Sequence, residues 1–353
     1  MKTTITSLLV VFTFVFGASH ALAAPKTPVA SPQVNPKDII VASWNIENLF
    51  DDEDDPDNPG DDEFTPSAWR RWSTARYRLK LTNCADIVSM MKPDVLVLAE
   101  VENKRVLDEL CEVLDNVYHY PMPHIIHRDS TDPRGIDVCM ISRIKPDRVT
   151  WIKPGTGLRD SPMVDFKAGI NSFTVIGNHW KSRWGDKKQS DATRSYMASK
   201  VKASWLHVLK EKPSAAIVVT GDFNDDIDDY VPQVAGGFSL DRQEVLRGGT
   251  NLFNVSSELP KEKRGSYFYS QTKTWHSFDQ MNVSRGLLKE GRPASPWYTS
   301  SELFQVFADD KLRQKDYFNA PYPFRRIGTK NGQKILNGYS DHFPILIHLK
   351  ARQ

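Results

Sequence analysis

Apolar and polar positions follow two alternating patterns along the chain, and together they predict a mixed α/β fold. Residues 95–98 form a continuous apolar run, which is typical of a strand buried on both faces of a sheet. Other strands are expected at 39–46, 137–141, 172–178, 215–220, 278–283 and 345–349. Helices are expected where apolar residues recur at helical spacing, over 76–91, 106–114 and 191–209. Residues 285–337 are polar, with many Gly, Pro and aromatic residues, and predict loops and short elements around a site.

The first residues have the layout of a secretory signal peptide. Lys2 gives a positive start, residues 8–16 form a short apolar run, and Ala21-Leu22-Ala23 is a small-x-small cleavage pattern. The run is too short to span about 30 Å of hydrocarbon, so no stable membrane insertion is expected after cleavage. We therefore predict a signal peptide at 1–23, a Pro- and Ala-rich linker at 24–37, and one exported domain at 38–353, periplasmic or secreted.

Composition excludes several classes of protein. With 40% hydrophobic and 25% charged residues among 353, the chain is neither disordered nor a multi-span membrane protein. Nine acidic residues lie in one segment, residues 51–63, which we call the acidic loop; the rest of the mature chain has 45 basic and 35 acidic residues, a net charge of +10. A positive body is compatible with a polyanionic substrate such as nucleic acid.

The three cysteines, Cys84, Cys111 and Cys139, do not have the spacing of a metal site. In an oxidising compartment, a disulfide between Cys84 and Cys111 is one arrangement, with Cys139 left free. The favoured interpretation is three small core residues.

Polar residues fall where the predicted strands begin or end. They are Asn45, Glu47, Glu100, His179, Asp222, Asn224, Asp341 and His342. Side chains at strand ends converge on one rim of a sheet, where binding sites are commonly built. Carboxylates at such a rim suit Mg²⁺ or Mn²⁺, and His side chains can transfer protons near neutral pH. Each residue alone is more often structural than functional, so it is the ordered set that points to a site.

Seven motifs carry a resemblance to a known family. They are SWNIENLF (43–50), DVLVLAEVEN (94–103), RGIDVCMISR (134–143), GNHWKSR (177–183), TGDFND (220–225), SFDQMNVS (277–284) and GYSDHFPI (338–345). In this order they resemble the endonuclease/exonuclease/phosphatase superfamily, over about residues 40–349. The resemblance implies a four-layer α/β/β/α sandwich of two packed mixed sheets flanked by helices, with the site at one end of the sheets.

The resemblance also implies a role for each matched residue. Asp222 aligns or deprotonates the attacking water, Asn224 binds the scissile phosphate, and Asp279 orients His342. His179 and His342 stabilise or protonate phosphate oxygens. The implied metal-site residues are Asn45, Glu47, Glu100 and Asp341, which would bind Mg²⁺ or Mn²⁺, with Ca²⁺ as an additional structural ion. The implied substrate-binding residues are Arg134 and Arg183.

The expected function is exported, divalent-metal-dependent phosphodiester hydrolysis of DNA or RNA, by a monomeric enzyme of endonuclease type. Alternatives within the superfamily are a sphingomyelin or phospholipid phosphodiesterase and a sugar-phosphate phosphatase. A remote alternative is a non-catalytic exported protein that binds polyanions or Ca²⁺. Trp180, Trp184 and Trp275 are candidates for stacking on bases, although core packing is the favoured interpretation.

Overall fold

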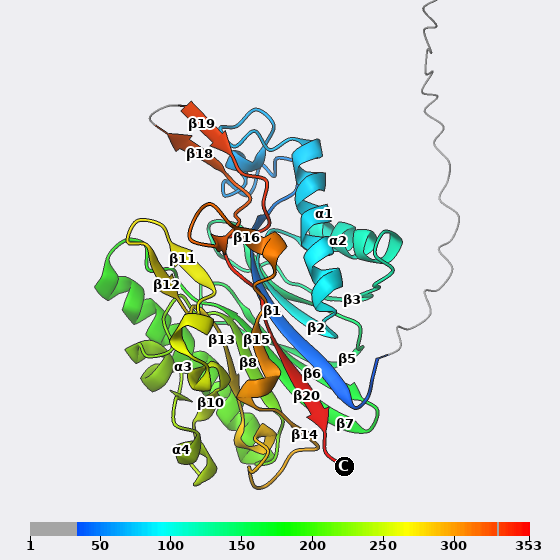
Figure 1. The fold of residues 1–353 in the computed structure, drawn as a ribbon, viewed down its shortest axis with the longest axis vertical. Coiled ribbons are helices and arrows are strands. Elements are labelled where there is room, and N and C mark those ends of the chain that lie inside the picture. The colour runs from blue at the N-terminus through cyan, green and yellow to red at the C-terminus, as the bar shows by residue number, and fades with distance from the viewer. Residues whose placement is uncertain (1–33, 330–331) are drawn as a thin grey trace, which may run out of the picture. The chain divides into compact units, whose positions relative to one another are not determined.

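Two mixed seven-stranded sheets dominate the computed structural model, which describes residues 34–329 and 332–353 (Figure 1). The first sheet has the order β14 (Trp297–Tyr298), β20 (Ile345–Ala351), β1 (Asp38–Leu49), β2 (Val95–Val101), β4 (Asp137–Ser142) and β3 (His124–Ile126), with β15 (Phe304–Val306) also paired to β20. The second has the order β5 (Pro146–Ile152), β6 (Ser161–Ala168), β7 (Asn171–His179), β8 (Ile217–Asp222), β13 (Asp279–Val283), β10 (Leu252–Asn254) and β9 (Phe238–Ser239).

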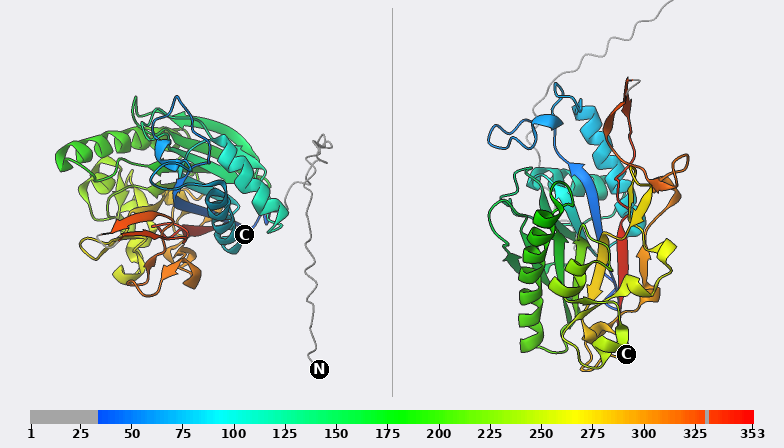
Figure 2. Two further views of the ribbon diagram at one scale, coloured as in Figure 1. Left: turned by 90° about the horizontal axis from the view of Figure 1, so that it is seen from above. Right: turned by 90° about the vertical axis from the view of Figure 1, so that its left-hand side faces the viewer.

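Helices cover the outer faces of these sheets (Figure 2). They are α1 (Thr74–Met91) and α2 (Lys104–Asn116) on the first sheet and α3 (Lys187–Glu211) on the second, whereas the short α4 (Arg242–Leu246) packs beside β9 and β10. Three small hairpins complete the chain: β11 (Tyr267–Tyr269) with β12 (Thr274–His276), β16 (Arg313–Gln314) with β17 (Ala320–Pro321), and β18 (Arg326–Thr329) with β19 (Gly332–Ile335). The predicted strands and helices are all confirmed, and residues 285–337 form the expected loops and short elements.

Three apolar layers hold the sheets and helices together. Along β1, Trp44 and Ile46 pack in the layer under α1 and α2, whereas Ile39 and Val41 face the second sheet. The outer face of the second sheet packs against α3, where Trp205 is fully buried. Because side chains alternate between the two faces of a strand, one buried strand serves two layers at once. The predicted four-layer α/β/β/α sandwich is confirmed.

The cysteines are free thiols and contribute to the layer between the first sheet and its helices. Cys84 and Cys139 are buried there, and Cys111 packs against its edge. The favoured interpretation, three small core residues, therefore agrees with the structure.

The predicted signal peptide, together with residues 24–33 of the predicted linker, lies outside the described residues. Within the described part of the chain, no helix combines the length and the apolar character needed to cross a membrane.

Strand direction brings the polar strand ends together. β1 runs parallel to β2, and β20 runs antiparallel to β1, so β20 begins where β1 and β2 end. In the second sheet β7 runs parallel to β8, and β13 runs antiparallel to β8, which gives the same arrangement. The polar residues therefore gather at one end of the strands in each sheet. Contacts between the two sheets bring these two ends together, as described below.

The two sheets approach each other closely at Gly177, near these strand ends, and this contact generates a stability prediction. A Cβ added at Gly177 in β7 would lie 2.8 Å from Cγ1 of Val97 in β2. Overpacking a core in this way costs about 1–3 kcal/mol, so Gly177→Ala should lower the free energy of unfolding by that amount. Adding Val97→Ala removes the clashing methyl, so the double variant should lose less than the sum of the single losses in urea denaturation. Additive losses would show that the two positions do not press on each other.

Candidate active site

Six side chains from the two sheets meet where the polar strand ends of both sheets come together. Asn45, Glu100, His179, Asp222 and Asp279 come from five different strands, and His342 lies three residues before the start of β20. All but Glu100 are almost completely buried. The structure thus brings together residues that the sequence separates by up to about 300 positions.

Asn45 connects the first sheet to the second. Its side-chain Nδ2 donates to Oδ2 of Asp222, 2.9 Å away, and more weakly to Oε1 of Glu100, 3.4 Å away. Its Oδ1 accepts from the backbone N–H of Glu47 at 3.1 Å. Both ends of the amide are therefore engaged, and Asn45 orients two carboxylates. The predicted metal-binding role of Asn45 stays a prediction.

Asp279 and His342 form a buried pair. Nδ1 of His342 lies 2.7 Å from Oδ2 of Asp279, and Nε2 lies 3.9 Å from Oδ2 of Asp222. Burial alone would lower the pKa of His342, but the carboxylates of Asp279 and Asp222 raise it to about 10. His342 is therefore a cation at neutral pH, aimed at Asp222. The positioning expected for Asp279 agrees with this contact.

His179 approaches the same carboxylate oxygen of Asp222 as His342 does. Its Nε2 is 3.6 Å from Oδ2 of Asp222 and 3.9 Å from Oε1 of Glu100. Burial, reinforced by the positive charges of Arg159 and Arg134, holds the pKa of His179 well below its usual value. Two buried histidines in one site thus have opposite protonation states: His342 is charged and His179 is neutral.

Two irregular strands aim the metal-site candidates. Glu47 and Glu100 both have positive φ, 55° and 67°, and both lie where the strand pairing shifts register. A β-bulge redirects a side chain at the cost of backbone strain, and such strain is concentrated at functional sites. Glu100 points into the site by this means, where its other oxygen accepts from the backbone N–H of Asn48 at 3.0 Å.

Arg325 engages the other two carboxylates of the predicted metal site. Glu47 accepts hydrogen bonds from the backbone N–H of Phe324 at 2.7 Å and from Nε of Arg325 at 2.5 Å, and Arg325 also pairs with Asp341. Both oxygens of Glu47 are therefore occupied, which favours an anchoring role for this residue. The sequence reasoning missed Arg325, because a single Arg in a loop segment gives no signal.

The donor set fits a hard divalent cation. Glu100 and Asp341 offer partly accessible carboxylate oxygens at the site, the ligand type that Mg²⁺ and Mn²⁺ prefer. Asp222, Asp279 and His342 also place one potential ligand atom each within 4.8 Å of the others.

Asn224 follows Asp222 in a tight turn with a positive φ of 53°. Its backbone N–H donates to Oδ1 of Asp222 at 2.9 Å, and its side-chain Nδ2 donates to the carbonyl oxygen of Trp180 at 3.1 Å. The turn therefore fixes Asp222 and Asn224 relative to each other.

Arg134 lies at the mouth of the site. Its Nη1 is 3.7 Å from Oε1 of Glu100, and the side chain is half exposed. The acidic loop packs against it so closely that a Cβ at Gly60 would lie 2.3 Å from the carbonyl oxygen of Arg134. The position is suitable for the predicted contact with substrate, which stays a prediction.

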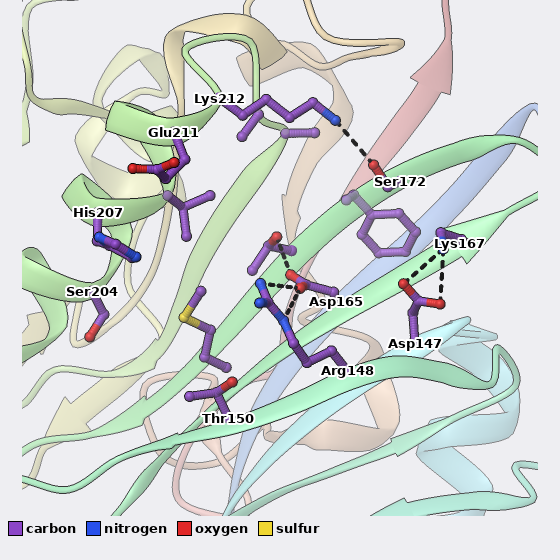
Figure 3. Close-up of a pocket in the computed structure, with 16 residues that line it drawn as sticks. Asp147, Arg148, Thr150, Asp165, Lys167, Ser172, Ser204, His207, Glu211 and Lys212 are labelled. Carbon is purple, nitrogen blue, oxygen red and sulfur yellow. Dashed lines mark hydrogen bonds and ion pairs between the residues drawn. The ribbon is translucent and has the colours of Figure 1, made fainter.

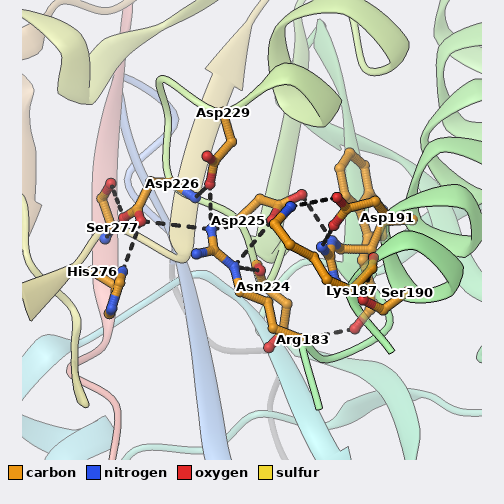
Figure 4. Close-up of polar contacts among 12 residues, drawn as sticks. Arg183, Lys187, Ser190, Asp191, Asn224, Asp225, Asp226, Asp229, His276 and Ser277 are labelled. Carbon is orange, nitrogen blue, oxygen red and sulfur yellow. Dashed lines mark hydrogen bonds and ion pairs between the residues drawn. The ribbon is translucent and has the colours of Figure 1, made fainter. Parts of the chain in front are cut away.

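Arg183, also predicted to bind substrate, is held in an acidic cluster instead (Figure 4). It donates to the carbonyl oxygen of Asn224 at 2.8 Å and pairs with Asp225 and Asp229, while its guanidinium lies over the ring of Phe278. These contacts favour a role in supporting the turn after Asp222, and the predicted contact with substrate remains untested.

Trp180 is fully buried, in line with the favoured interpretation, whereas Trp184 and Trp275 are 89% and 41% exposed. Core packing was therefore the wrong interpretation for Trp184 and Trp275.

A separate hollow of about 590 Å³ lies beside α3, against β5–β7 (Figure 3). Its charged residues are largely paired with each other, as in Arg148 with Asp165 and Lys167 with Asp147. None of the predicted site residues lines it, so we assign it no part in the chemistry.

Two arginines on Asp225 give a graded stability prediction. Arg194 and Asp225 form a buried ion pair, 2.8 Å long, with side chains 1% and 5% exposed. Removing one partner of such a pair costs about 3–5 kcal/mol, so Arg194→Met should be strongly destabilising. Arg183 is 37% exposed and screened by solvent, so Arg183→Met should cost at most about 1 kcal/mol. Lys187→Met, in an exposed pair, is the control; similar losses for all three in chemical denaturation would contradict this ranking.

Comparisons with known proteins place this geometry in context. Residues 40–351 match the protein family described as Endonuclease/Exonuclease/phosphatase family. No curated protein matches the sequence significantly.

Solved structures share the fold at low identity. A Bacteroides thetaiotaomicron protein of the same family has 16% identity and a TM-score of 0.53, with 91% of this chain and 100% of that chain covered. Danio rerio TDP2, complexed with a single-strand DNA product, has 15% identity and a TM-score of 0.50, with 88% and 98% covered. The mannosyl-6-phosphatase Bt3783 of B. thetaiotaomicron has 15% identity and a TM-score of 0.52, with 88% and 99% covered.

Proposed function

Because the chain belongs to the Endonuclease/Exonuclease/phosphatase family, whose members are phosphoric ester hydrolases, we propose that it is an exported phosphodiesterase that hydrolyses nucleic acid with a divalent metal ion. The observation that carries the proposal is the position of Asp222, which lies between Asn45, the neutral His179 and the charged His342. A carboxylate held in this way can align a water molecule, while a cation beside it can meet a phosphate oxygen.

Each of these site residues has a separate role in an in-line attack of water on the phosphate. Burial raises the pKa of Asp222 to about 6, with His342 opposing the rise, so the carboxylate is ionised at neutral pH and can accept a proton from the attacking water. The His342 cation stabilises charge on the phosphate oxygens, and Asn224 and the neutral His179 add hydrogen-bonding groups. Glu100, with Asp341, would hold Mg²⁺ or Mn²⁺, which when bound supplies positive charge to polarise the phosphate.

Two observations support nucleic acid as the substrate class. The net charge of +10 outside the acidic loop favours a polyanion. The likeness to TDP2 with its single-strand DNA product is a second support. The likeness to a mannosyl-6-phosphatase keeps a sugar-phosphate phosphatase as the second candidate. Residues 1–23 support export by their signal-peptide pattern.

Metal dependence is the first prediction from this proposal. Hydrolysis of supercoiled plasmid should stop in EDTA and return with Mg²⁺ or Mn²⁺. Glu100→Gln keeps the side-chain size but loses the negative charge, so activity should fall at least about 100-fold. Glu262→Gln, at an exposed glutamate of a 3-10 helix, is the matched control and should behave as wild type. Full activity in EDTA would refute the assignment.

Coupling between Asp279 and His342 is the second prediction. His342→Ala should lose about 10²–10⁴-fold in rate, the usual cost of a positioned acid–base group. Asp279→Asn should also lose much of the rate, because the 2.7 Å contact to a carboxylate disappears. If the two residues act as a unit, the double variant should be little worse than His342→Ala alone. Losses that multiply would show independent action, and His207→Ala, at an exposed position on α3, controls for the general effect of removing a histidine.

A further inference from the structure

A cavity of about 350 Å³ opens directly beside the catalytic residues. It is lined by residues of β11, the β16–β17 hairpin, β19 and the segments that lead to β20, and most of these residues belong to 285–337. Its lining includes Tyr267, Tyr317, Pro321, Arg325, Lys334 and Asp341.

Tyr267 and Asp341 tie this cavity to the reaction site. The ring of Tyr267 lies 4.7 Å from the ring of His342, and the two residues form a β-bridge. Asp341 is a predicted metal ligand and also lines the cavity. A substrate phosphate at His342 would therefore place its neighbouring group at the cavity entrance.

Aromatic side chains form part of the cavity wall, and Phe318 and Lys273 extend this aromatic group outside the lining. Phe268 lies in its wall, with its ring 5.8 Å from Tyr317 and 5.2 Å from Phe318. Phe318 is 52% exposed, and Nζ of Lys273 lies 5.6 Å from the centre of its ring. Large aromatic side chains left open to solvent beside lysines are characteristic of surfaces that stack nucleobases and contact the adjoining phosphates.

We propose that this cavity, the base subsite, binds an unpaired nucleobase next to the scissile phosphate. The proposal rests on the phosphodiesterase function proposed above and extends it by naming the part of the substrate, a nucleobase, that the protein recognises. Tyr317 contacts its aromatic neighbours edge-on and offers a ring face to the base, and Lys334 offers positive charge to the next phosphate. A base in a duplex has both faces covered by its neighbours, so the subsite selects single-stranded or frayed nucleic acid.

Size and charge favour this occupant over the alternatives. The volume lies at the low end of the roughly 300–1,000 Å³ of ligand pockets, which is enough for one base and its sugar. A sugar monophosphate has only the phosphate that the reaction site takes, so it would leave Lys334 without an anionic partner. A lipid tail would leave the charge of Lys334 without a partner.

Direct binding tests the subsite without requiring turnover. A fluorescein-labelled single-stranded DNA oligonucleotide, titrated in EDTA and followed by anisotropy, should bind Tyr317→Ala about 10–100-fold more weakly than wild type, because base–aromatic stacking is lost. Lys334→Ala, at an exposed position that does not affect the core, should also weaken binding and should reduce its dependence on salt. Tyr196→Ala is the matched control: Tyr196 is an exposed tyrosine on α3 with Lys200 beside its ring, and its loss should change nothing.

Turnover separates the subsite from the catalytic machinery. Tyr317→Ala should raise KM for the oligonucleotide and leave kcat at saturating oligonucleotide unchanged, because Tyr317 contributes to binding and not to the reaction at the phosphate. Wild-type affinity in Tyr317→Ala, or equal wild-type affinity for single strand and duplex, would overturn the subsite. Failure of the wild-type protein to hydrolyse any phosphodiester with Mg²⁺ or Mn²⁺ would instead overturn the proposed function, whatever the binding result.

Discussion

The hydrogen bond from Asn45 to Asp222 links the ends of the two sheets, and the candidate active site depends on the alignment that this bond reflects. Asn45 belongs to β1 in the first sheet and Asp222 to β8 in the second. The apolar layer between the sheets supplies the free energy of packing, but apolar contacts alone do not specify alignment to within an ångström. Polar contacts at the edge, including that between Asp279 and His342, define the geometry.

Charge is distributed unequally around this alignment. A neutral imidazole and a charged one both lie near the same oxygen of Asp222, so a single carboxylate has a neutral neighbour and a cation beside it. In the same way, the positive charge of Arg325 compensates the negative charges of Glu47 and Asp341. The site therefore stays electrostatically compensated even though it gathers several buried carboxylates, which are costly without partners.

Local patterns in the sequence predicted the mixed α/β class and a site at the strand ends, whereas the family resemblance implied the four-layer arrangement and the role of each site residue. Continuous apolar runs indicated the central strands, and polar residues at their ends indicated the site. Edge strands such as β5 were not predicted, because Pro146–Ile152 is mostly exposed and has no apolar pattern. The partners of Arg183 and Arg325 were also not predicted, because tertiary contacts bring distant carboxylates within reach of an arginine. Trp275 was misjudged for the same reason, because burial of a hairpin side chain depends on what packs over it.

Substrate choice is the most direct test of the account. We would measure kcat/KM of the wild-type protein with Mg²⁺ for a single-stranded DNA oligonucleotide and for mannose 6-phosphate under identical conditions. The account predicts efficient cleavage of the phosphodiester and little or no release of phosphate from the sugar monoester. A higher kcat/KM for mannose 6-phosphate would contradict it and would identify the protein as a phosphomonoesterase.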